Sequence, residues 1–171
     1  MSKPTLSICL ALLSLLVLAN TYSITLPNSF TVPIISTVQA GYSVTYSSLY
    51  TNPDCWMFTL NHPFSAWSAY VSNTSQWVQV SSTKNEVWVA VITQGRPNAD
   101  QWVTEYRVSY TLDGTSWTYV DNSKLFTGNS NRNTQVRQFF SRGIYARAIR
   151  IHPTKWKNWV SMRFEALIID S

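Results

Sequence analysis

The chain has 171 residues, of which 45% are hydrophobic and 12% charged, and its formal net charge at pH 7 is +5. Two histidines and eight acidic residues provide few groups for catalysis, and there is no Gly-x-Ser-x-Gly motif, phosphate-cradling loop or metal-type spacing of His and Cys. These features argue against an enzyme. Most cationic residues fall in the last third, which is either an anion-facing patch or a solvated, mildly basic face.

The first predicted element is a secretory signal peptide over residues 1–23. Lys3 precedes an apolar run at residues 6–18, and small or polar residues follow up to a cleavage site after Ala19 or Ser23. The run is short for a membrane span, and an uncleaved membrane anchor is the alternative. We therefore expect one domain over residues 24–171, long enough to bury a core, in a protein that is secreted or held at the cell surface.

Export of the chain would affect the chemistry of its cysteines and of Asn73. Cys9 lies within the signal peptide, so Cys55 has no partner for an internal disulfide in the mature chain. Cys55 is then a buried apolar group, a free thiol or half of an intermolecular bridge. Asn73 begins an Asn-Thr-Ser sequon, which predicts a glycosylated surface loop in an exported chain.

Scarce glycine and charge, together with abundant Val, Thr, Ser, Tyr and Trp, predict an all-β domain of short strands. The expected strands cover residues 77–80, 87–92, 102–110, 117–120, 146–152 and 160–169. Within 102–110 the even positions are mainly aromatic or apolar and the odd ones mainly polar, which is typical of a half-buried strand. Asp113-Gly114 then predicts a hairpin turn.

Four charged residues of the later strands have predicted orientations. Arg147 shares its parity with two isoleucines and is expected to point toward the apolar side, whereas Arg150 is expected to point outward. Arg163 and Glu165 occupy the face of the last strand opposite its apolar residues, where we expect them to bind neighbouring backbone.

Several short motifs follow one another along the chain. They are WVQV at 77–80, VITQGR at 91–96, YTLDGTSW at 110–117, IRIHP at 149–153 and MRFE at 162–165. In this order and spacing they resemble the discoidin domain, also called the coagulation factor V/VIII C-type domain. ADQWVT at 99–104, NRNT at 131–134 and IHPTKW at 151–156 are especially similar to the slime-mould discoidins. The chain departs from the family pattern because it lacks the terminal cysteine pair and the Arg-Gly-Asp motif, and because Ser81 replaces the usual acidic residue.

The resemblance implies an eight-stranded, jelly-roll-like β-sandwich or distorted barrel whose loops at one end meet the ligand. Those loops are expected at residues 54–64, 69–76 and 95–101. A sugar site needs aromatic rings against the apolar face of the sugar and polar groups for its hydroxyls. The residues that we expect to bind the ligand are Trp56, Phe58, Asn61, His62, Arg96, Asn98 and Asp100.

Two further expectations concern the same loops. Phe64 offers a third ring for the sugar face, but a role in packing its own loop is favoured more for Phe64 than for Trp56. Some members of the family imply a structural calcium ion, for which Asp54 and Asn61 are the candidates, and no other cofactor is expected.

These observations predict a secreted, non-catalytic carbohydrate-binding module of the lectin type that serves cell adhesion by binding a cell-surface or extracellular glycan. An anionic phospholipid membrane is the first alternative, because CWMFTL at 55–60 resembles an apolar loop tip, although the polar loop 95–101 weakens it. A protein-binding structural module of the extracellular space is the second. No nucleic acid partner is expected of an exported chain. Because one sugar site binds weakly, a homo-oligomer is expected.

Overall fold

The computed structural model describes residues 22–25, 31–38, 40, 42–50 and 58–169, and the first two strands through their backbone alone. The described residues form ten strands and one turn of 3-10 helix, η1 (Val120–Asn122), with no α-helix. The strands are β1 (Tyr22–Thr25), β2 (Thr31–Ser36), β3 (Ser43–Tyr46), β4 (Trp67–Ser68), β5 (Val78–Gln94), β6 (Trp102–Thr111), β7 (Thr118–Tyr119), β8 (Phe126–Thr127), β9 (Val136–Lys157) and β10 (Ser161–Ile169).

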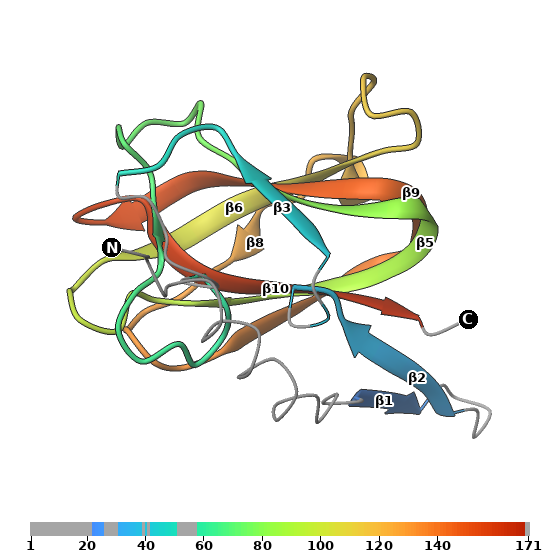
Figure 1. Cartoon of the computed structure of the whole chain (residues 1–171), viewed down its shortest axis with the longest axis horizontal. Helices are drawn as coiled ribbons and strands as arrows, with labels where there is room; N and C mark the ends of the chain where they lie inside the picture. Colours follow the sequence, from blue (N-terminus) through green and yellow to red (C-terminus); the bar gives the residue numbers. More distant parts are fainter. Residues whose placement is uncertain (1–21, 26–30, 39, 41, 51–57, 170–171) are drawn as a thin grey trace, which may run out of the picture.

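The strands form an antiparallel sandwich in which β5 and β9 belong to both layers (Figure 1). The first half of β5 pairs with β3 and with the second half of β9, which in turn pairs with β6. The second half of β5 pairs with β10 and with the first half of β9. The all-β sandwich expected from the sequence is thus confirmed.

Both long strands change layer where they bend, and the register of their pairing shifts there. Between Ser81 and Glu86 the ladder skips four residues of β5, and a second irregularity separates Trp88 from Ala90. Extra residues on one strand bend it and increase its twist. We call this end of the sandwich, formed by residues 82–87, 112–117 and 141–147, the bend end.

Because of this bend, Arg147 does not point toward the apolar side as expected. Its side chain is exposed, while Ala146, Ala148 and Ile149 are all buried. Two successive buried residues at Ala148 and Ile149 switch the inward-facing parity of β9 from even to odd, next to the residues that β5 skips. Arg150 points outward as expected, and its guanidinium carbon lies 4.0 Å from the ring centroid of Trp77 and 3.8 Å from that of Trp117.

A similar irregularity affects the alternation predicted for β6. Tyr106 and Val108 are fully buried, as the even positions should be, but at the start of the strand Val103 is buried and Trp102 is half-buried. The pairing of β6 with β9 shifts on either side of Glu105, which reverses the parity. The predicted alternation is therefore correct only from Tyr106 to Val108, since Ser109 and Thr111 are buried while Tyr110 is half-buried.

The core between the layers is dominated by large aromatic side chains. Those that are almost completely buried are Trp67, Trp88, Tyr106, Phe126 and Phe164. Tyr106 stacks on Phe126 with ring centroids 5.7 Å apart, and the indole of Trp88 donates to the carbonyl of Ala146 at 2.8 Å. Burial of each such side chain stabilises the fold by about 1.5–3 kcal/mol, which gives the loops a rigid base.

Candidate ligand-binding loops

The end opposite the bend carries most of the loops of the described chain, and we call it the loop end. β5 and β9 both begin and finish there, while β6 and β10 begin there. The segments at this end are residues 58–66, 69–77, 95–101, 128–135 and 158–160. Loops carried by rigid strands are the usual location of binding residues in β-sandwiches.

Arg163 in β10 holds three of these loops together. Its side chain is 2% exposed, and it donates to the carbonyl of Gly95 at 2.8 Å, to that of His62 at 2.9 Å and to that of Arg132 at 2.7 Å. A guanidinium can satisfy three separate acceptors because its five N–H groups form a rigid plane. The sequence prediction that Arg163 binds neighbouring backbone is confirmed.

Glu165, on the same face of β10, is also confirmed as a ligand of backbone. Its carboxylate is fully buried and accepts the amide of Val38 at 2.5 Å and that of Ala166 at 2.9 Å. The hydroxyl of Thr37 donates to the same oxygen at 3.3 Å. Glu165 therefore attaches the segment that follows β2 to β10.

Gln94, the last residue of β5, joins two loops. Its amide nitrogen donates to the carbonyl of Asn133 at 2.6 Å and to Asn61 Oδ1 at 3.2 Å, and its oxygen accepts the Asn61 amide at 2.8 Å. Asn61 has a φ of 61°, a left-handed conformation that asparagine tolerates better than most residues. Asn61 Oδ1 also accepts from Gln135, so two hydrogen bonds already engage the oxygen that we considered for calcium.

The loop 95–101 is organised by its own side chains. Arg96 donates to Asn98 Oδ1 at 2.7 Å and to Gln101 Oε1 at 2.9 Å, and its amide donates to the carbonyl of Gln101. The Asn98 amide donates to the carbonyl of Phe64 at 2.7 Å, which brings this loop against residues 58–66. Arg96 and Asn98 are therefore held in place before any ligand arrives.

Asp100 connects the same loop to two others. It forms an ion pair with Arg132 at 2.8 Å, and its carbonyl accepts the side-chain amide of Asn158. The hydrogen bond from Arg132, together with its charge, lowers the pKa of Asp100 below its ordinary value. Because both partners are exposed, we expect the ion pair to position the loops more than to stabilise the fold.

His62 is held as a neutral ring by its surroundings. Its Nδ1 accepts the amides of Phe64 at 3.3 Å and Ser65 at 3.1 Å, which requires an unprotonated nitrogen. Burial and the charge of Arg163 lower its pKa. His62 thus shapes the loop through Nδ1, and its other ring nitrogen is the one left to meet a ligand.

The structure brings five of the seven predicted binding residues to the loop end, and these are Asn61, His62, Arg96, Asn98 and Asp100. Phe58 is a correction, because its ring is only 9% exposed and stacks on Phe164 with centroids 5.5 Å apart. Its loop has to enter the core to anchor itself, so the ring cannot face a sugar. Trp56, Asp54 and Cys55 lie outside the described residues.

Phe64 is a second correction, in the opposite direction. Its side chain is 75% exposed, so it does not pack within its loop as expected. Its ring makes an edge contact with that of His62, with centroids 6.3 Å apart. The backbone of Phe64 is fixed against the loop 95–101 because its carbonyl accepts the Asn98 amide, and its ring is left exposed.

Sequence reasoning missed a second aromatic group at the loop end. The rings of Tyr50 and Tyr70 are 6.4 Å apart, that of Trp159 is 6.2 Å from Tyr50, and the two tyrosines are 59% and 64% exposed. Trp159 donates to the carbonyl of Ala69, which joins the loops 69–77 and 158–160. The sequence signal for this group was the occurrence of Tyr50 and Tyr70 in segments that connect strands rather than in the strands themselves.

The described part of the chain lacks a clustered metal site and a membrane-spanning helix. It contains no group of three His, Cys, Asp or Glu side chains that is arranged to hold a metal ion. No helix in that part is long and apolar enough to cross a membrane.

Comparison with known proteins gives the same assignment as the motifs. The F5/8 type C domain family model matches residues 43–166. Discoidin-2 of Dictyostelium discoideum is 39% identical over 100 residues, which are 58% of this chain and 39% of that protein. Bovine lactadherin is 36% identical over 111 residues, which are 61% of this chain and 26% of that protein. The chain thus spans less than half the length of either relative.

Solved structures extend the similarity to the fold. Wild-type discoidin II from Dictyostelium discoideum has a TM-score of 0.76 and 31% identity, over 81% of this chain and 59% of that one. The family 32 CBM from C. perfringens NanJ, solved in complex with galactose, has a TM-score of 0.64 and 15% identity, over 78% of this chain and 98% of that one. With the matched residues and motifs described above, the chain belongs to the F5/8 type C, or discoidin, domain family.

Proposed function

We propose that the chain is a non-catalytic carbohydrate-binding module that serves cell adhesion and binds an extracellular or cell-surface glycan at its loop end. The observation that carries this proposal is the exposed ring of Phe64 on a residue whose carbonyl is bonded to Asn98, which is in turn preorganised by its hydrogen bond with Arg96. A sugar ring offers an apolar face for stacking and hydroxyls at its edge, and this arrangement matches both.

Each group has a distinct role in this proposal. The ring of Phe64 stacks against the C–H face of the sugar, while Arg96, with one guanidinium nitrogen beyond its two internal bonds, donates to a hydroxyl. Asn98, His62 and Asp100 border the same surface and provide further donors and acceptors.

The rigidity of the loop end supports the same function. Weak ligands such as single sugars bind better when the site does not have to become ordered, since ordering costs free energy on binding. The hydrogen bonds of Arg163 and Gln94 already hold the loops 58–66, 95–101 and 128–135. The galactose bound to the family 32 CBM also supports a sugar ligand, although that likeness by itself concerns only the fold.

A glycan array probed with the purified protein tests this function. Phe64→Ala and Arg96→Ala should each reduce glycan binding about tenfold, because each removes a stacking or hydrogen-bonding contact worth roughly 1–1.5 kcal/mol. Arg147→Gln, an exposed arginine at the bend end, is the matched control and should leave binding unchanged. Binding that survives both loop variants, or no glycan signal for the unmodified protein, would refute the proposal.

A second candidate function is binding to an anionic phospholipid membrane. The exposed apolar side chains at the loop end favour it, namely Tyr50 (59%), Phe64 (75%), Tyr70 (64%) and Val71 (48%). Aromatic side chains are favoured at the headgroup level of a bilayer, and each one that enters adds apolar burial. The polar loop 95–101, in which Asn98 is bonded to the Phe64 carbonyl, is better suited to a glycan.

Vesicles distinguish the two candidates. If the membrane is the ligand, phosphatidylserine vesicles should bind the protein, Tyr70→Ala and Phe64→Ala should both weaken binding, and Arg96→Ala should have a small effect. If a glycan is the ligand, Arg96→Ala should be as damaging as Phe64→Ala. A protein partner remains the third candidate, and it predicts that neither vesicles nor glycans bind.

We also propose that the chain is exported with removal of residues 1–23 and that it acts as a homo-oligomer. Exposed Asn73 would then carry a glycan in the loop 69–77, and its Oδ1 accepts the amide of Ser75 at 3.0 Å. Sequencing of the secreted N-terminus tests the cleavage, and the loss of a glycosidase-sensitive mass in Asn73→Gln tests the modification.

A further inference from the structure

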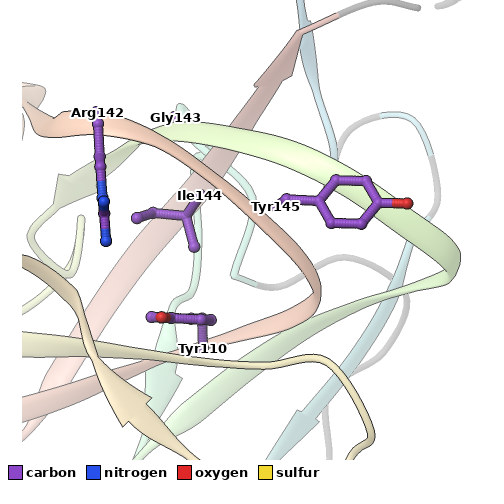
Figure 2. A pocket seen from close by; sticks show the side chains of 5 residues that line it. All are labelled: Tyr110, Arg142, Gly143, Ile144 and Tyr145. Atoms are coloured by element: carbon purple, nitrogen blue, oxygen red, sulfur yellow. The ribbon is translucent and has the colours of Figure 1, made fainter.

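A pocket of about 170 Å³ lies at the bend end, away from the loops considered so far. It is lined by Tyr110, Arg142, Gly143, Ile144 and Tyr145, so β6 forms one side and the bend of β9 the other (Figure 2). Tyr110 is the next-to-last residue of β6. The pocket is therefore the place where the core of the sandwich meets solvent at this end.

The side chains that face the pocket are set by the parity of the two strands. Arg142 and Ile144 occupy even positions of β9, like buried Phe140 and Ala146, and Figure 2 shows both of them extending toward the ring of Tyr110. The ring of Tyr145 points away from Tyr110. Ile144 is buried and the half-buried Tyr110 packs against the core, whereas Arg142 is exposed. The pocket thus combines an aromatic ring, an aliphatic side chain and a cation.

Gly143 brings β9 close to β5 beneath the pocket. A Cβ atom at this position would lie 2.7 Å from Val87 Cγ1, nearer than two carbon atoms can approach without displacement. The glycine therefore allows the tight bend that directs Arg142 toward Tyr110, and it leaves its backbone open at the pocket surface.

The acidic groups at the bend end are already satisfied by other donors. Asp121 accepts the amide of Ser141 at 2.9 Å as well as its hydroxyl. Asp113 accepts two amides of its own turn at 2.8 Å, and these hydrogen bonds lower its pKa well below the ordinary range. Buried Glu86 accepts the hydroxyls of Ser82 and Tyr42 and faces Lys84 at 3.7 Å. None of these three described carboxylates forms an ion pair with Arg142.

Arg142 and Tyr110 thus remain available to a ligand. Within residues 42–50 and 58–169, no side-chain hydrogen bond or ion pair engages either the guanidinium of Arg142 or the hydroxyl of Tyr110. A guanidinium binds a planar oxyanion through two parallel N–H groups, and a tyrosine ring accepts the C–H face of a sugar while its hydroxyl bonds to the sugar's oxygens.

We infer that the pocket at the bend end is a second binding site, specific for a six-membered sugar ring that carries a carboxylate. Arg142 binds the carboxylate, and Tyr110 and Ile144 contact the ring. The net positive charge of the chain favours such anionic ligands over neutral ones. This site is separate from the proposed glycan site at the loop end and does not depend on it.

The pocket lies at the end of the sandwich opposite the proposed glycan site. β6 runs from the loop end to the bend end with ten residues, and at about 3.3 Å per residue the two sites lie about 30 Å apart. A domain with a site at each end could link two glycan chains without oligomerising. Such bivalence increases apparent affinity for a surface that presents many copies of a ligand.

A titration followed by NMR tests the inference on the ¹⁵N-labelled protein, with glucuronate as the probe and glucose and sulfate for comparison. Glucuronate should shift the backbone amides of Gly143, Ile144 and Tyr145, while glucose should not. Arg142→Gln should raise the dissociation constant for glucuronate at least about tenfold, and Tyr110→Phe, which retains the ring, about fivefold.

Arg147→Gln is the matched control, since it removes the same charge from an exposed position five residues away whose parity directs it to the other face. It should change the dissociation constant by less than about twofold. The inference is overturned if Arg147→Gln is as damaging as Arg142→Gln, if sulfate binds as tightly as glucuronate, or if the shifts map to the loop end. Neutral-glycan binding by Arg142→Gln should be unaffected, so failure of this site and failure of the loop-end site can be told apart.

Discussion

Arg163 illustrates at the scale of single residues how one buried side chain determines the shape of the loop end. Sequence parity was enough to place it opposite the apolar face of β10, and its charge implied polar partners. The identity of those partners, the carbonyls of Gly95, His62 and Arg132, depends on three loops that are distant in sequence. Parity shows which way a side chain points, but not which loops meet it there.

We predict that Arg163→Lys destabilises the protein and impairs glycan binding. A lysine ammonium cannot reach three carbonyls in one plane, so at least one buried carbonyl is left without a donor, at a cost of about 1–3 kcal/mol. Urea denaturation should therefore show a lower free energy of unfolding. Arg147→Lys, at an exposed position, is the control. An Arg163→Lys protein as stable as the control would contradict the role of the guanidinium.

His152 predicts a dependence of stability on pH. Burial, with a smaller contribution from the charge of Arg150, lowers the pKa of His152 from 6.5 to about 4, and its Nε2 lies 2.8 Å from the Ser109 hydroxyl. The unfolded chain therefore binds a proton more readily than the folded one between these values. The stabilising contribution is complete above pH 6.5 and is lost as the pH falls toward 4.

The measurement is the free energy of unfolding in urea between pH 7 and pH 4. The loss attributable to His152 should not exceed about 3 kcal/mol, with some reduction from solvent screening of a group that is not completely buried. His152→Gln retains a polar partner for Ser109 and should show a smaller decline over this range. Equal slopes for the two proteins would mean that His152 is not the group that titrates.

At the scale of elements, the bends of β5 and β9 decide both ends of the molecule. Because each strand turns back on itself, its first and last residues lie at the same end of the sandwich. The loops that precede and follow the strand therefore meet there. The same bends create the pocket beneath Arg142. Bulges are poorly visible in sequence, since four skipped residues in a polar link look like an ordinary turn, and for this reason the predicted orientation of Arg147 was wrong.

We predict that Gly95→Ala disturbs the loop end more than the rest of the fold. A Cβ atom there would lie 2.6 Å from the Asn131 carbonyl oxygen and 2.8 Å from Arg132 Cα, and both are backbone atoms that cannot rotate away. Overpacking of this kind costs about 1–3 kcal/mol. Hydrogen exchange should increase in residues 95–101 and 128–135, whereas Thr74→Ala, in an exposed loop at the same end, should leave it unchanged. Unaltered exchange in Gly95→Ala would show that these loops are not tightly packed.

At the scale of the whole molecule, the two ends differ in chemistry as well as in shape. The loop end presents exposed rings beside polar groups that are bonded to one another, such as Arg96 with Asn98. The bend end presents Arg142 without an internal acidic partner in the part of the chain that is described. Adhesion usually requires more than one contact, and a domain with two dissimilar ends provides a way to achieve it in addition to oligomerisation.

Much of the candidate site followed from the sequence, and the exceptions have physical causes. The motifs located the loops, and polar loop residues such as Arg96 and Asn98 could be expected at the surface. The aromatic residues could not be assigned in the same way, because a ring in a loop can either anchor the loop or remain exposed. Phe58 became the anchor and Phe64 remained exposed, the reverse of what we expected.

By itself, the sequence determined the all-β class, the family and the segments that form loops, since these depend on composition, turn residues and short motifs. Only the tertiary structure decided which rings are buried, where the strands bend and which loops share Arg163. Those features arise from contacts between residues far apart in the chain, where packing and the need to satisfy buried hydrogen-bonding groups outweigh local preference.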